Sequence, residues 1–318
     1  MPSTTVPMNK PLHAGLFLAT CVSTFSMFYV GFGGGVDGST EDKVWGSAFY
    51  SGVVMLILLS HELGHYFMAR AHGVDASLPY FIPVPLGFGT MGAVIRLRGT
   101  IPNRNALVDI GAAGPLAGLL IAVPMLFVGV WLSHVAKTPV DSSAGLPPSL
   151  SLINLASMGG LYIKHLVFEA PMPELPQMQI FGDNLLSLFA VRVIHGVLPP
   201  GSDVMAHPVF IAAWFGLVVT MLNLLPVGQL DGGHLTHAWY GEKAEALGAR
   251  IAGAALLMAL FFSASWLIWF VLITRVIGVG HPPVAEPGAP LSRGRKVVVV
   301  ISWIMTGLTF MPIPMSVA

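Results

Sequence analysis

A short run of metal-binding and acid–base residues, His61-Glu62-Leu63-Gly64-His65, has the spacing of a zinc site. Residues four apart on a helix share one face, so both imidazoles can reach a single ion. Glu62 lies beside them, where its carboxylate can take a proton from water on the metal. The pattern therefore predicts two ligands, His61 and His65, and a general base, Glu62, within about one helical turn.

A catalytic zinc ion usually has three protein ligands, and a second polar cluster can supply the third. Residues 223–234 read NLLPVGQLDGGH. Pro226 ends the preceding apolar segment, and the glycines that follow permit a tight backbone path that places Asp231 at the start of the next helix. His234 is a rival third ligand, because it lies three residues after Asp231 and can share its face. The remaining histidines lack paired spacing and are expected in loops or interfaces, among them His72, His195 and His207.

The composition indicates that both clusters lie in a membrane protein. The 318 residues are 54% hydrophobic and 9% charged, which leaves too little polar surface to cover a water-soluble globule. A formal net charge of zero provides no basic face for nucleic acid. Cys21 is the single cysteine, so an internal disulfide and a cysteine-rich zinc site are excluded.

Six apolar segments are candidates to cross about 30 Å of hydrocarbon. They are 12–32, 45–71, 107–135, 209–225, 251–277 and 297–311. The polar break at 263–265 allows 251–277 to be one crossing or a helical hairpin, and we prefer the hairpin because it keeps the basic residues near 295 on the basic side. We expect about six or seven crossings, with 12–32 retained as a helix rather than removed as a signal peptide.

The position of His61 in its segment adds weight to the metal site. His61 lies about 24 Å along the helix from Trp45, at about 1.5 Å per residue, and should therefore still be inside the bilayer. Ionisable residues at that depth are costly and usually functional.

The distribution of Arg predicts which side faces the cytoplasm. Four arginines follow the second segment and mark that side as cytoplasmic: Arg70, Arg96, Arg98 and Arg104. The acidic stretch 135–207 should lie on the opposite side. Within it, 183–197 is too short to cross and is expected to lie in the interface, re-enter the membrane or pack as a lid.

We predict an all-α polytopic membrane protein with a short membrane-associated β-hairpin within 78–101, after the helix that carries the two histidines. The unpaired edge of such a hairpin could receive an extended substrate. Gly111, Gly114 and Gly118 should serve either close helix packing or the shape of the substrate path. We expect one membrane domain over 1–318, composed of a first helix and loop (1–44), a catalytic core (45–235) and C-terminal helices (236–318).

The two clusters together resemble the paired signatures of the site-2 protease family of intramembrane zinc metalloproteases, of the M50 type. HELGH matches the HExxH pattern of that family, and NLLPVGQLDGG matches its NxxPxxxLDG pattern, in the same order and in apolar segments. Residues 108–118, VDIGAAGPLAG, are similar to the EGY-like subgroup, which lacks an inserted PDZ domain.

This resemblance implies a role for each residue of the site. One Zn²⁺ per chain would be bound by His61, His65 and Asp231, and Glu62 would activate zinc-bound water. Asn223 matches the family asparagine near the catalytic centre, where it positions the substrate backbone or stabilises the oxyanion. The alternative for Asn223 is an interhelical hydrogen bond.

The resemblance also implies the reaction and the partners. Expected substrates are transmembrane segments of single-pass or other membrane proteins, cut in regulated intramembrane proteolysis. The lipid bilayer is the other expected partner, the oligomeric state stays open, and the expected location is a bacterial plasma membrane with the site near the cytoplasmic face. The alternatives are a catalytically silent zinc-binding scaffold, which should have lost the glutamate or a ligand, and a metal transporter, which should carry polar sites along several helices.

Overall fold

The helix that carries both histidines begins at a capping box. The Ser39 side chain accepts the backbone N–H of Asp42, and the Asp42 carboxylate accepts the backbone N–H of Ser39. These two bonds satisfy backbone donors that the first turn leaves free. From there the apolar sequence continues as one helix to Ala71, and Gly73 follows in the left-handed region with a φ of 71°.

In this computed structural model the described residues are 9–31, 38–137, 152 and 179–317. Their elements, in chain order, are α1 (Lys10–Gly31), α2 (Thr40–Ala71), β1 (Asp75–Ala76), β2 (Tyr80–Pro83), β3 (Thr90–Val94), β4 (Leu97–Arg98), α3 (Arg104–Leu132), β5 (His134–Lys137), β6 (Gln179–Phe181), α5 (Leu185–His195), β7 (Ser202–Met205), α6 (Pro208–Asn223), α7 (Asp231–Tyr240), α8 (Lys243–Phe261), α9 (Ser265–Val271), η3 (Leu272–Ile277), α10 (Arg293–Thr309) and β8 (Met315–Val317). The molecule is mostly helical, as the composition predicts.

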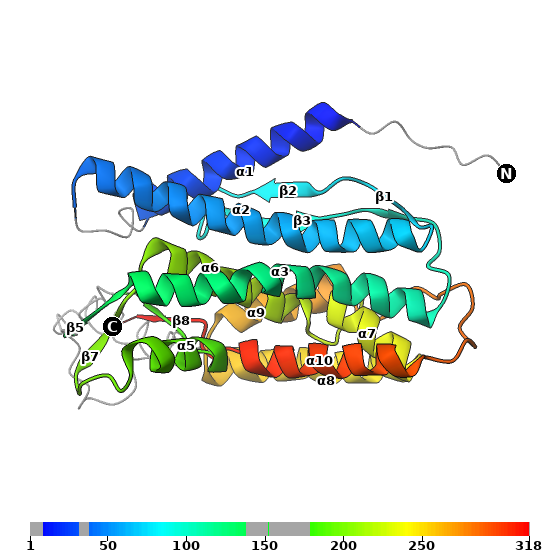
Figure 1. The fold of residues 1–318 in the computed structure, drawn as a ribbon. Coiled ribbons are helices and arrows are strands. Elements are labelled where there is room, and N and C mark those ends of the chain that lie inside the picture. Colours follow the sequence, from blue (N-terminus) through cyan, green and yellow to red (C-terminus); the bar gives the residue numbers. More distant parts are fainter. Residues whose placement is uncertain (1–8, 32–37, 138–151, 153–178, 318) are drawn as a thin grey trace, which may run out of the picture.

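Helix α3 lies at the centre of the fold. It packs most extensively against α2 and next against α6, and Figure 1 shows α3 with α1 and α2 on one side and α10 and α8 on the other. The main core contains large side chains of α2 and α6 that are almost inaccessible, such as Tyr50 and Trp214. The helices that carry the two candidate clusters therefore both pack against α3.

Among the described residues, four helices are long and apolar enough to cross a membrane: α1, α2, α3 and α8. Three shorter apolar helical stretches are α5, α6 and residues 265–277. The total of about six or seven crossings stays a prediction. The polar break at 263–265 lies where α8 ends and α9 begins. A Cβ at Gly248, in α8, would lie 3.6 Å from Cβ of Val279, which follows η3. The chain therefore turns back on itself at the break.

The segment expected to form a hairpin contains two antiparallel strand pairs. β2 pairs with β3, with Tyr80 opposite Val94 and a register shift between Phe81 and Pro83. β1 pairs with β4, and both pairs follow α2 directly. Phe81 of β2 contacts Phe17 of α1 edge to face, with ring centroids 5.1 Å apart. The association of this segment with the membrane stays a prediction.

A charged cluster ties three helices together beyond the end of α2. Asp109 of α3 accepts hydrogen bonds from Arg295 of α10, with Nη2 2.6 Å from Oδ2 and Nε 3.0 Å from Oδ1. His72, the residue after α2, has its Nε2 2.9 Å from the same Oδ2. Two-point contacts of this kind fix the relative positions of helix ends. The cluster therefore holds α2, α3 and α10 in register at the basic end of the molecule.

The expected orientation can be tested at positions that the structure describes. Asp141, in the predicted acidic loop, lies outside the described residues, so Asp203 of β7 takes its place. Figure 1 shows β1, the partner of β4, and β7 near opposite ends of α2 and α3. In a Cys21→Ala background, Arg98→Cys and Asp203→Cys should react with a membrane-impermeant thiol reagent from opposite sides of sealed vesicles. Reaction of both from one side contradicts the predicted topology.

Candidate active site

His61 and His65 face one another on the same side of α2. Both are buried, with 4% and 7% of their surfaces exposed, and their ring centroids lie 4.9 Å apart. The two Nε2 atoms are separated by 3.1 Å. The four-residue spacing thus brings two potential ligand atoms to one point, as helical geometry requires.

Asp231 reaches the same point from the start of α7. Helix α6 ends at Asn223, the chain turns through Pro226, and α7 begins at Asp231 itself. A Cβ on Gly232 or Gly233 would collide with backbone carbonyl groups of residues 224–228, so only glycine allows the first turn of α7 to lie this close to the loop. The glycines predicted to permit a tight path therefore set the position of the carboxylate.

The three side chains form a triangle of ligand atoms that fits a zinc ion. Asp231 places Oδ2 3.2 Å from His61 Nε2 and Oδ1 3.2 Å from His65 Nε2. Ligands bound tetrahedrally at about 2.0 to 2.1 Å from zinc lie about 3.3 Å from one another. In the described part of the chain, these three residues are the group whose ligand atoms come close enough together to hold a metal. His234 lies outside the group, so the geometry favours Asp231 as the third ligand.

Hydrogen bonding at His65 points to a cation within the triangle. His65 Nδ1 lies 2.7 Å from the backbone oxygen of Ile110, and because a carbonyl only accepts, Nδ1 must carry the proton. In a neutral imidazole the Nε2 atom then presents a lone pair to the Asp231 carboxylate and to His61. Lone pairs facing one another repel unless a metal ion or a proton lies between them. The Ile110 carbonyl also orients the ring, as outer partners of metal-binding histidines usually do.

A row of glycines on α3 makes room for the histidines. A methyl group at Gly114 would overlap the His65 imidazole, and one at Gly118 would lie 3.4 Å from His61 Cβ. One turn earlier, a Cβ at Gly111 would lie 2.9 Å from Cβ of His234. These three glycines therefore let α3 approach the histidines of α2 and α7 closely. This is the packing role, one of the two roles expected from the sequence.

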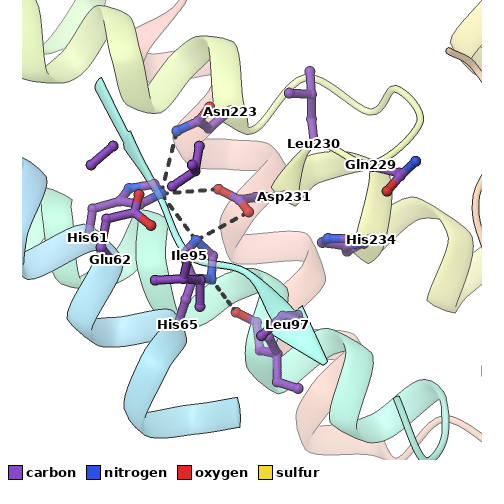
Figure 2. A pocket seen from close by; sticks show the side chains of 13 residues that line it. His61, Glu62, His65, Ile95, Leu97, Asn223, Gln229, Leu230, Asp231 and His234 are labelled. Carbon is purple, nitrogen blue, oxygen red and sulfur yellow. Dashed lines mark hydrogen bonds and ion pairs between the residues drawn. The ribbon is translucent and has the colours of Figure 1, made fainter. Parts of the chain in front are cut away.

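Glu62 shares a cavity of about 210 Å³ with the three ligands. The carboxyl group is buried, with 5% of the residue exposed, and Ile95 lines the same cavity. Ile95 follows β3, and Figure 2 shows this strand passing directly in front of His61 and Glu62. The other residues that line the cavity are Ala93, Val94, Leu97, Ile110, Asn223, Gln229, Leu230 and His234. The candidate base, the three candidate ligands and an extended strand thus surround one small space.

Asn223 also lies at this cavity, at the end of α6. Its Nδ2 is 3.4 Å from His61 Nε2, a long contact that joins α6 to α2. Figure 2 shows Asn223 on the side of His61 away from His65. The structure therefore brings together all five residues that the sequence singles out: His61, Glu62, His65, Asn223 and Asp231.

The histidines without paired spacing serve other parts of the fold. His195 has its Nε2 2.9 Å from the Val130 oxygen, and His207 accepts the N–H of Val209 at the start of α6. The sequence analysis missed one histidine, His281. Its Nε2 atom lies 2.6 Å from Nδ1 of His234. It follows η3 and precedes two prolines, with no periodic spacing to either cluster, so no local signal could have identified it.

The contact between Gly114 and His65 yields a prediction. Gly114→Ala should displace the His65 ring, because a core overpacked by one methyl group is strained by about 1 to 3 kcal/mol. We expect much less zinc per purified chain than in the wild type. Gly52→Ala, on the exposed side of α2 with no atom within 4 Å of the added carbon, is the matched control and should retain zinc. Equal zinc in the two variants would show that Gly114 does not support the ligand.

Comparison with known proteins agrees with this chemistry. Residues 49–265 match peptidase family M50. The probable zinc metalloprotease EGY1, chloroplastic, of Arabidopsis thaliana is 30% identical over 269 residues, which cover 82% of this chain and 42% of that protein. The probable zinc metalloprotease EGY2, chloroplastic, of Oryza sativa subsp. indica is 29% identical over 233 residues, which cover 73% of this chain and 36% of that protein.

A solved structure is also similar to this chain. The site-2 protease from Methanocaldococcus jannaschii aligns with 92% of this chain and 86% of its own, at 15% identity and a TM-score of 0.33. The curated relatives are longer, and this chain spans less than half the length of EGY1 and EGY2. The family match covers more than half of the 318 residues, and the chain belongs to peptidase family M50.

Proposed function

We propose that this chain is an intramembrane zinc metalloprotease that hydrolyses peptide bonds within or near transmembrane segments of other membrane proteins. The observation that carries the proposal is the triangle of the buried His61 and His65 with the partly buried Asp231, with Glu62 in the same cavity. Membership of peptidase family M50 supports peptidase chemistry, and relatives named probable zinc metalloproteases support zinc as the metal. We propose one Zn²⁺ per chain, held by these three residues.

Glu62 would serve as the general base. Zinc, when bound, would polarise the carbonyl of the substrate and make a water molecule acidic enough to lose a proton near neutral pH. The Glu62 carboxylate lines the cavity and can accept that proton, and the resulting carboxyl group can donate it to the nitrogen of the leaving amine.

Asn223 would act on the substrate rather than on the metal. Its amide now points at His61 Nε2 over 3.4 Å. With His61 Nε2 as a metal ligand, its lone pair would be taken up, and the Asn223 amide N–H would have no acceptor on His61. We propose that it then donates to the substrate carbonyl oxygen as negative charge develops there. A purely interhelical contact between α6 and α2 is the alternative for this residue.

The substrate would bind in extended form along β3. A peptide bond within a transmembrane helix is shielded by the helix, so the segment must unwind before Glu62 and zinc can reach it. β3 pairs with β2 along one edge, and among the described strands none pairs along the other. Ala93 and Val94 at the end of β3, and Ile95 directly after it, line the catalytic cavity. An added substrate strand would satisfy its freed backbone groups on β3 and pass the site.

The expected partners are therefore the lipid bilayer and membrane-protein substrates. Four apolar helices and the family support an integral membrane protein. The active site is proposed to lie near the cytoplasmic face, on the side of the arginines that follow α2. The relatives in plants carry chloroplastic names, and the bacterial plasma membrane expected from the sequence stays a prediction.

Two other classes of protein are less consistent with the site. A silent scaffold has no use for a buried glutamate beside the ligands, yet Glu62 is present and 5% exposed. A transporter should present ligand groups at several depths, whereas the described residues give one such group. Both alternatives become outcomes of the following experiment.

Replacement of the base separates an enzyme from a scaffold. Glu62→Gln retains the size of the side chain but removes the proton acceptor, so zinc content and folding should be unchanged. Cleavage of membrane-protein substrates should fall by about 10² to 10⁴, the usual contribution of general acid–base catalysis. His65→Ala is the contrasting variant, which should lose zinc as well as activity.

The measurement is zinc per chain together with cleavage rates for a panel of single-pass membrane proteins. Cleavage by Glu62→Gln at the wild-type rate contradicts the proposed mechanism. Zinc-loaded wild-type protein that cleaves no member of the panel would favour the scaffold.

A further inference from the structure

Two histidines connect the catalytic cavity to a second cavity. His234 of α7 lines the catalytic cavity, and Figure 2 shows it at the edge beyond Asp231. His281, in the segment after η3, lines a separate cavity of about 810 Å³. The two rings meet between these spaces, with His234 Nδ1 2.6 Å from His281 Nε2. A continuous pair of imidazoles therefore separates the site of hydrolysis from the second cavity.

The protons on this pair can be assigned from its hydrogen bonds. His281 Nδ1 lies 2.6 Å from the oxygen of Pro282, and since a carbonyl only accepts, Nδ1 is the donor. In neutral His281 the Nε2 atom must then accept, so His234 Nδ1 donates to it. Neutral His234 is left with an unprotonated Nε2 on the edge of the ring opposite His281. In this assignment the Nδ1–H groups of His234 and His281 both donate away from the catalytic cavity. His234 Nε2, at the start of the chain, is free to accept a proton.

The surroundings keep the pair neutral and in place. Burial, followed by the nearby charges of His234 and His237, lowers the pKa of His281 to about 3. Charged groups at the second cavity are Arg104, Glu242, Lys243 and Glu245, and Asp231 and His65 act on His234 from the catalytic side. The His237 ring stacks on His281 with centroids 4.2 Å apart and an angle of 15°.

That stacking also argues against a second metal ion. Nitrogen lone pairs lie in the plane of an imidazole ring, so the lone pairs of two nearly parallel rings point side by side rather than at one point. His237 and His281 therefore cannot converge readily on one metal, whereas His234 and His281 are already in contact through their nitrogens.

We propose that His234 and His281 form a proton-transfer path from the catalytic cavity to the second cavity. The proposal rests on the proposed hydrolysis. After the peptide bond breaks, the new carboxyl group gives its proton to His234 Nε2. The Nδ1 proton of His234 moves to His281 Nε2, and the Nδ1 proton of His281 passes to water in the second cavity. Both rings are then protonated at Nε2, and between turnovers each exchanges a proton with water, taking one up at Nδ1 and releasing one from Nε2, which restores the starting tautomers with no net change in protons. The product carboxylate is left ionised, and the product amine takes up a proton once it reaches water, so the proton balance closes.

The path gives His234 and His281 a role in hydrolysis that does not require either residue to bind zinc. Glu62 can return only one proton to the amine, and the second proton released by hydrolysis must leave a cavity of about 210 Å³ bounded by apolar helices. A base oriented by a second side chain is the arrangement that proton transfer requires. His234 serves as that base, and His281 orients it through the 2.6 Å bond.

The test uses full-length protein loaded with zinc and a single-pass substrate that the wild type cleaves. His281→Gln keeps a hydrogen-bonding side chain but cannot pass a proton, so kcat should fall by roughly 100-fold, the lower end for acid–base groups, with KM and zinc unchanged. His281→Ala should lose as much, and added imidazole, which can enter the second cavity, should restore part of kcat. His195→Gln, on the distant α5, is the control and should cleave at the wild-type rate.

Four results would overturn or replace the proposed path. Wild-type kcat in His281→Gln, or a loss in His281→Ala that imidazole does not restore, overturns the path while leaving the protease intact. Two zinc ions per chain, one of them lost in His281→Gln, would replace the path by a metal site. Absence of cleavage by zinc-loaded wild type overturns the proposed function and the path with it. In ¹⁵N-histidine spectra of the substrate-free protein, His234 Nε2 should be unprotonated, and a protonated Nε2 also overturns the path.

Discussion

A carboxylate that is 14% exposed and faces two buried imidazoles needs positive charge beside it, and this requirement organises the structure. Asp231 lies 3.2 Å from Nε2 of both His61 and His65 in surroundings dominated by apolar helices. An unpaired charge in such surroundings would be strongly destabilising, by several kcal/mol. A divalent metal satisfies the carboxylate and both lone pairs at once. The glycines of α3, the capping box of α2 and the turn before α7 can all be understood as means of keeping three ligands together.

The sequence was sufficient to predict those parts of the site that depend on local geometry. Four-residue spacing on a helix places His61 beside His65. The order of Pro and Gly between Asn223 and Asp231 predicts a break between two helices, and Asp231 lies at the start of the second. Most helix positions in the described residues follow from the apolar runs, with ends that differ by up to about five residues. The predicted segment 251–277 is the exception, because α8 already begins at Lys243 and the rest of the segment is divided into α9 and η3. These features are decided by neighbours in the chain, which a sequence displays directly.

Contacts between distant helices could not be predicted in the same way. Which face of α3 meets His65 depends on how two helices cross, and so the close approach at Gly114 appeared in the sequence only as small-residue spacing with two possible roles. The bond between His234 and His281 joins a helix to an irregular segment, and Asp109 with Arg295 joins two helices nearly two hundred residues apart. Resemblance to a family supplied the third ligand, which the residues alone had left open between Asp231 and His234.

The most direct test of the account is zinc X-ray absorption spectroscopy of the purified chain, with the zinc content measured on the same sample. We predict about one zinc ion per chain with four nitrogen or oxygen ligands, two of them imidazoles, because a catalytic site keeps one position for water. Sulfur ligands are not expected, since Cys21 is the single cysteine and lies on α1. Three imidazoles around the metal, or protein that retains no zinc, would contradict the assignment of His61, His65 and Asp231.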